Sequence, residues 1–70
     1  MTKFSTYLKA ERLKRAWSQE QMATKLEISL IWYKRLELGQ DKPGVMVQSK
    51  LAKLTRRSTT FIYKLVNEEE

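Results

Sequence analysis

The residues that most often interrupt helices lie together in one short part of this chain. The 70 residues contain 2 glycines and 1 proline, and all of them fall within the sequence ELGQDKPG at residues 37–44. Because tight turns depend heavily on glycine and proline, the rest of the chain offers few places for β-hairpins. The pattern predicts an all-α fold with one clear loop and no sheet.

Apolar residues recur at helical spacing in separate segments, and residues that favour helix ends lie between them. The sequence SQEQ at residues 18–21 matches a capping box, Ser29 is a second N-cap, and Gly39 suits the position just after a helix. Ser58 or Thr59 would cap the last helix. The expected core residues are Phe4, Tyr7 or Leu8, Leu13, Met22, Ala23, Leu26, Tyr33, Leu36, Val47, Leu51 and Leu54. We expect a compact bundle of about five short helices, as a single domain over residues 1–67 with an acidic tail at residues 68–70.

The charge balance favours an anionic partner. The chain has 14 Lys and Arg against 8 Asp and Glu, a formal net charge of +6. Three of the acids are residues 68–70, so the balance over residues 1–67 is 14 − 5 = +9. A small basic domain of this kind is typical of nucleic-acid binding by phosphate neutralisation, although a basic surface also occurs on proteins without such a partner.

Several function classes are disfavoured by composition. The chain has no Cys and no His, so it lacks a disulfide framework, the usual metal ligands and the usual general base. It has no Gly-rich phosphate loop and no nucleophile–base set. No apolar run approaches the roughly 20 residues of a membrane span, and the N-terminus lacks a signal-peptide core. We therefore expect a cytoplasmic, non-enzymatic protein without a cofactor.

Residues 18–39 have the spacing of a helix-turn-helix. The small Ala23 allows two helices to cross closely, while Tyr33 and Leu36 hold the second helix on the core. The second helix would then present its opposite face outward.

A similar spacing recurs later in the chain. Four residues of the helix-turn-helix segment have counterparts of like character: Ala23, Ser29, Tyr33 and Leu36 correspond to Ala52, Ser58, Ile62 and Leu65. The recurrence indicates either a duplication or one packing solution used twice.

The sequence RLKRAWSQEQMATKLEISLIWYKRLELG, residues 12–39, resembles the Cro/cI repressor-type helix-turn-helix proteins of phages and bacteria. That pattern is Arg, an apolar residue, a turn, Ser/Thr-Gln-x-x-Leu-Ala, then Ser, an apolar residue, x-x-x-Glu and Gly. The chain follows it without gaps through Arg12, Leu13, Trp17, Ser18, Gln19, Met22, Ala23, Leu26, Ser29, Tyr33, Leu36, Glu37 and Gly39. The likeness continues loosely through KLAKLTRRSTTFIYKL.

The resemblance implies roles for individual residues. Arg12 and Glu37 would form a structural ion pair between the first helix and the end of the third. The DNA-binding set would be Gln19, Ser29, Lys34, Arg35 and Lys42, with Gln19 and Lys42 on phosphates. Family members often pair through the last helix, which would place a homodimer face at Phe61, Ile62, Leu65 and Val66; core packing is the alternative for the same residues.

The chain departs from the family pattern at two places. The turn position that favours Gly is Glu27, which must accept strain or an altered turn. The base-reading positions, usually polar, are Leu30 and Ile31. On a helical wheel, Ile31 and Leu38 point away from the core direction, with cations beside them.

This apolar outer face favours a protein partner over base edges, because Leu and Ile leave the hydrogen-bonding groups of the bases unpaired. The expected partner-binding residues are Leu30, Ile31, Trp32, Lys34, Arg35 and Leu38. The interpretation we favour from sequence is a phage antirepressor, a modulator of the lysis–lysogeny switch that docks on a partner repressor. The alternative is a Cro-like repressor that binds operator DNA directly.

Overall fold

The computed structural model describes residues 2–67, which form five α-helices. The bounds are α1 Lys3–Lys14, α2 Gln19–Leu26, α3 Leu30–Glu37, α4 Val45–Thr55 and α5 Thr59–Asn67. No strand occurs in this part of the chain, so the all-α expectation is confirmed. The expected acidic tail at residues 68–70 lies outside the described residues.

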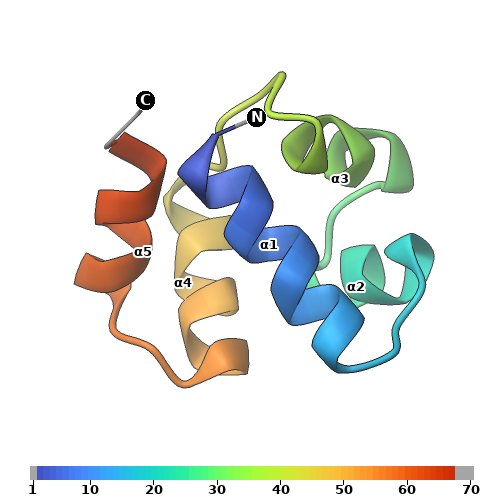
Figure 1. Ribbon diagram of the computed structural model, residues 1–70, viewed down its shortest axis with the longest axis horizontal. Coiled ribbons are helices and arrows are strands. Elements are labelled where there is room, and N and C mark those ends of the chain that lie inside the picture. Colours follow the sequence, from blue (N-terminus) through green and yellow to red (C-terminus); the bar gives the residue numbers. More distant parts are fainter. Residues whose placement is uncertain (1, 68–70) are drawn as a thin grey trace.

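The helices form two pairs with α1 lying between them (Figure 1). Within the pairs, α2 packs on α3 and α4 packs on α5; α1 contacts both α3 and α5, and α2 also reaches α4. Across residues 2–67, no helix has both the length and the apolar character required to cross a membrane. The arrangement leaves one side of α3 free of the other helices.

One apolar core joins both helix pairs. Its buried members are Phe4, Leu8, Met22, Ala23, Leu26, Tyr33, Leu36, Val47, Leu51, Ala52, Ile62 and Val66. Tyr7, Trp17 and Leu54 pack against this core but remain partly exposed. The contacts that hold the two pairs together are therefore mostly those that helical spacing predicts.

Leu13 is the exception, because it is 56% exposed and the expected core position is wrong. At about 100° per residue, the nine residues from Phe4 to Leu13 make about two and a half turns, so Leu13 lies on the opposite face of α1 from the buried Phe4. The face of α1 that continues from Phe4 and Leu8 reaches Glu11 instead, and Glu11 is 8% exposed.

The helices α2, α3 and α5 begin at the predicted capping residues. Ser18 accepts a hydrogen bond from the backbone N–H of Gln21, whose side chain accepts one from the Ser18 N–H, so the capping box is present. Ser29 caps α3 at 3.1 Å, and Ser58 accepts the N–H of residue 61 at 3.0 Å. Gly39 follows α3 with φ +76°, in the left-handed conformation that glycine adopts without steric cost.

Three other helix ends use the same left-handed turn without glycine. Ala16, Glu27 and Arg56 have φ values of 58°, 60° and 60°. For a residue with a Cβ atom this conformation costs roughly 1–2 kcal/mol. Glu27 therefore takes the left-handed conformation in the turn position that favours Gly, at this steric cost.

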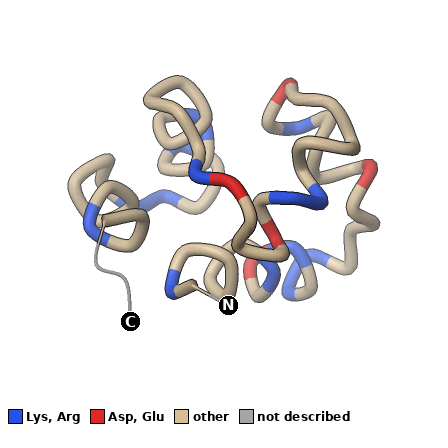
Figure 2. Tube along the Cα trace, turned by 90° about the horizontal axis from the view of Figure 1, so that it is seen from above, with Lys and Arg blue, Asp and Glu red and all other residues tan. Residues whose placement is uncertain are grey.

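Positive charge is spread over the whole molecule rather than gathered on one helix. Each of the five helices carries at least one Lys or Arg (Figure 2). Charge alone therefore does not mark the binding face, and the placement of individual side chains must identify it.

Candidate nucleic-acid interface

The inner face of α3 holds the helix against the rest of the molecule. Tyr33 and Leu36 are fully buried on this face, and Ala23 of α2 is 2% exposed beneath it. Because Ala23 has only a methyl side chain, α2 and α3 can approach closely. The orientation of α3 is therefore fixed by packing along one side.

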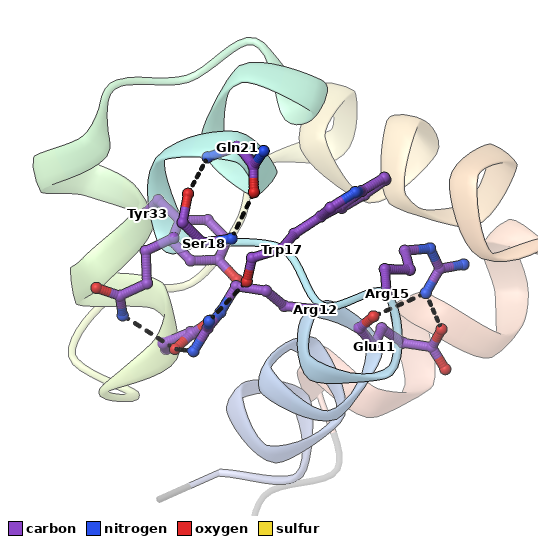
Figure 3. A network of polar contacts seen from close by, with 9 residues as sticks. Glu11, Arg12, Arg15, Trp17, Ser18, Gln21 and Tyr33 are labelled. Atoms are coloured by element: carbon purple, nitrogen blue, oxygen red, sulfur yellow. Dashed lines mark hydrogen bonds and ion pairs between the residues drawn. The ribbon is translucent and has the colours of Figure 1, made fainter.

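A buried polar cluster ties the end of α3 to α1 and α2. The Glu37 carboxylate accepts bonds from Arg12 Nε at 2.6 Å and Arg12 Nη2 at 3.2 Å, so the expected ion pair is present. It also accepts a bond from Gln19 Nε2 at 3.1 Å and one from the Tyr33 hydroxyl. Figure 3 shows the Arg12 guanidinium also donating to the carbonyl of Trp17, at 3.0 Å.

The cluster fixes the protonation states of its members. Burial alone would raise the pKa of Glu37, but the hydrogen bonds from Arg12, Tyr33 and Gln19 outweigh it and lower the pKa below its usual range. Burial and the bond to Glu37 raise the pKa of Tyr33. At neutral pH the site therefore contains a carboxylate, a guanidinium and a neutral phenol.

The outer stripe of α3 consists of Ile31, Lys34, Arg35 and Leu38, which follow one another at i, i+3, i+4 and i+7. All four are exposed, Ile31 at 75% and Leu38 at 62%. The outward direction predicted from the helical wheel is therefore confirmed. Leu30 and Trp32 are only partly exposed, and Trp32 packs against the core, which leaves the outer stripe as the surface open to a partner.

Arg35 is held by a residue that the sequence analysis did not single out. Its Nε lies 2.7 Å from Asp41 Oδ2, and its Nη2 lies 3.4 Å from Asp41 Oδ1. The hydrogen bond from Arg35 lowers the pKa of Asp41, so Asp41 is a carboxylate at neutral pH. An acid just beyond the Gly39 helix end is the sequence signal that could have suggested this pairing.

The other residues of the expected DNA-binding set come from three separate places: the start of α2, the start of α3 and the loop before α4. Gln19 begins α2 and lines an open groove of about 470 Å³ together with Lys9, Arg12, Lys34, Glu37 and Leu38. Ser29 is the N-cap of α3, and Lys42 is exposed in the loop that leads to α4. The assignment of these residues to DNA contacts stays a prediction.

The homodimer face suggested for α5 is wrong at two of its residues, for which the alternative of core packing is confirmed. Ile62 is 0% exposed and Val66 is 3% exposed, so both belong to the core of the single chain. Phe61 and Leu65 are partly buried against that core, and Phe61 also stacks edge-on with Tyr7 at 5.6 Å between ring centroids. These apolar residues attach α5 to the bundle.

Comparison with known proteins gives two matches. The helix-turn-helix family matches residues 8–62, a range that includes all of α2, α3 and α4. An uncharacterized HTH-type transcriptional regulator of Bacillus subtilis (strain 168), YqaF, is 35% identical over 63 residues, which cover 89% of this chain and 83% of that protein. No solved structure matches the chain.

Proposed function

Because the chain belongs to the helix-turn-helix family of transcription regulators, we propose that it binds operator DNA directly through α3. This places the direct-binding alternative ahead of the antirepressor that the sequence alone favoured. The observation that carries the proposal is the outer stripe, where the cations Lys34 and Arg35 lie opposite the buried Tyr33 and Leu36. A helix anchored along one side in this way can enter a major groove.

The contacts follow from the chemistry of the outer stripe. Arg35 suits a guanine, whose O6 and N7 accept two parallel hydrogen bonds. Ile31 and Leu38 have no hydrogen-bonding groups and suit thymine methyl groups. The operator is therefore expected to combine a G·C pair with neighbouring A·T pairs.

Phosphate contacts would come from residues on either side of α3. Gln19 gives one amide hydrogen to Glu37, and its second hydrogen and the backbone N–H groups at the start of α2 suit a phosphate. Lys42 would contact the backbone from the loop. The net charge of +6 supplies the sequence-independent part of the affinity.

The direct test is selection from a random pool of DNA duplexes with the isolated protein, followed by binding measurements over a range of salt concentrations. We expect one preferred sequence, bound with a Kd below about 1 µM, and a log–log salt dependence with a negative slope. Equal affinity for all duplexes would refute the proposal.

A second candidate is favoured by the exposed apolar atoms of the outer stripe. Ile31 and Leu38 are 75% and 62% exposed, and full burial of such a side chain is worth roughly 1.5–3 kcal/mol. A partner repressor with an apolar groove and an acidic rim would bury them and pair with Lys34 and Arg35. In that case the chain would be a phage-type antirepressor in a lysis–lysogeny switch.

Leu13 provides a matched control for this candidate, because it is an exposed leucine on α1, at 56%, outside the outer stripe. If α3 docks on a repressor, Ile31→Glu abolishes binding to that purified repressor, while Leu13→Glu leaves it intact. The isolated protein would then bind duplexes without sequence preference. Normal binding of the repressor by Ile31→Glu would remove this candidate.

A further inference from the structure

We propose that Asp41 is a positioning residue that holds Arg35 ready to read a guanine, so that part of the base specificity of α3 resides in the loop that follows it. The inference rests on the proposed function, because it requires a base edge in front of α3. It assigns a role to an acidic residue on a surface that otherwise attracts phosphates.

The pairing occupies only one edge of the guanidinium. Asp41 accepts from Nε at 2.7 Å and from Nη2 at 3.4 Å, which is a side-on approach to Arg35. Nη1 and the second hydrogen of Nη2 lie at the far end and take no part in these bonds. Guanine accepts through O6 and N7. The same guanidinium can therefore be held by Asp41 along its side while its end donates to guanine.

Holding Arg35 in this way reduces the conformational entropy that its side chain loses on binding. A free arginine side chain samples many rotamers, and fixing one of them costs conformational entropy that lowers affinity. In the free protein the pair already links the second turn of α3 to the loop, with the Arg35 side chain still 52% exposed. The bases therefore meet a side chain that is oriented in advance.

The loop does not depend on this pair for its own shape. The N–H of Gly39 bonds to the Leu36 carbonyl at 3.2 Å, and the N–H of Gln40 bonds to the Arg35 carbonyl at 3.0 Å. Pro43 is buried, and its carbonyl accepts a bond from the Gln48 side chain at 3.1 Å. An exposed ion pair adds little stability to a loop fixed by its backbone, which leaves the orientation of Arg35 as what the Asp41 carboxylate determines.

The side chain of Glu27 offers a matched control. It forms an equivalent exposed ion pair with Lys50 at 2.6 Å, and it lies in the turn between α2 and α3. Glu27→Gln removes one negative charge and releases one cation, as Asp41→Asn does, without touching Arg35. Any difference between the two variants therefore reports on Arg35 and not on charge.

The experiment measures discrimination at single base pairs with the full chain. The preferred duplex is first selected with the natural protein, and the base pair read by Arg35 is identified as the one at which Arg35→Ala shows no preference. For the natural protein, replacing this pair should weaken binding roughly 5- to 150-fold. We call the affinity for the preferred duplex divided by the affinity for the duplex with this pair replaced the discrimination ratio. For Asp41→Asn and Asp41→Ala, the discrimination ratio at this pair should fall several-fold, while the ratios at other positions stay unchanged.

The controls separate positioning from charge. Asp41→Glu, which retains the carboxylate, should keep part of the discrimination at the base pair read by Arg35. Glu27→Gln should keep all of it. Affinity for duplexes without the site should rise about twofold in both Asp41→Asn and Glu27→Gln. Circular dichroism establishes that each variant is folded before its binding is compared.

Two results would overturn the inference, and they differ in what else they overturn. If Asp41→Asn and Asp41→Ala keep the natural ratio at the base pair read by Arg35, Asp41 does not position that side chain, and the proposed function stands. If the natural protein selects no preferred duplex, there is no base for Arg35 to read, and the proposed function fails together with the inference.

Discussion

The helix pairs α2–α3 and α4–α5 share one local geometry but present different outer faces. Ala23 and Ala52 are buried at equivalent positions of the two pairs, and Ser29 and Ser58 are equivalent N-caps. Glu27 and Arg56 adopt the same left-handed conformation, with φ of 60° in each. The turn is therefore built by the spacing of a few residues and does not by itself decide what a helix pair does.

The outer positions carry the difference. The outer stripe of α3, Ile31, Lys34, Arg35 and Leu38, corresponds in α5 to Thr60, Tyr63, Lys64 and Asn67. The inner end differs as well, because Glu37 of α3 is the centre of a polar cluster whereas the equivalent Val66 of α5 is an apolar core residue. The end of α3 is therefore held by a charged, hydrogen-bonded cluster, whereas α5 is attached by apolar packing.

The largest expected effect concerns the polar cluster around Glu37. Glu37→Gln should destabilise the protein by about 3–5 kcal/mol, because it leaves the partly buried Arg12 without a countercharge. Val66→Ala, the matched change in α5, removes only apolar contacts and should cost less. Urea denaturation followed by circular dichroism measures both, and equal losses would contradict the difference between the two pairs.

The next effect concerns the outer faces. Arg35→Ala should weaken binding to the preferred operator by about 1–3 kcal/mol, because a bidentate contact with a base is lost. Lys64 occupies the equivalent position of α5, and Lys64→Ala should change specific binding less. Fluorescence anisotropy with a labelled duplex gives both affinities. A larger loss of affinity in the α5 variant would show that the pair α4–α5, and not α2–α3, binds the DNA.

The response to acid should also distinguish the pairs. The pKa of Glu37 is lowered in the folded protein, so its contribution to stability is present above the unfolded pKa of about 4.3 and is lost as pH falls through the lower folded value. Unfolding free energies measured between about pH 6 and pH 3 should therefore fall less steeply for Glu37→Gln than for the natural protein. An unchanged slope would mean that other carboxylates dominate.

The smallest effect concerns the shared turn. Arg56→Gly should stabilise the protein by up to about 1 kcal/mol, because glycine removes the steric cost of the left-handed conformation. Glu27→Gly should gain less, since it also breaks the ion pair with Lys50 at 2.6 Å. Thermal unfolding compares the two variants, and a larger gain at Glu27 would show that this ion pair contributes nothing.

Much of the fold follows from local rules that the sequence displays directly. The caps at Ser18, Ser29 and Ser58 and the left-handed Gly39 depend on bonds within a few residues, so their positions are predictable. The exposure of the outer stripe also follows from helix periodicity, once Tyr33 is assigned to the core.

Two features that sequence reasoning left open or did not single out depend on contacts between separate elements. The burial of Ile62 and Val66 depends on which elements α5 packs against, and an amphipathic helix can face a core or a partner with the same pattern. The pairing of Arg35 with Asp41 depends on the path of the loop after Gly39. Helical spacing contains no information about either.

The most direct test of the account is a titration of isotopically labelled protein with its selected duplex, followed by amide NMR spectra. We expect the largest shift changes at the outer stripe of α3 and at the start of α2, with small changes along α5. Changes concentrated on α5, or none on α3 while the duplex is bound, would contradict the claim that α3 reads DNA.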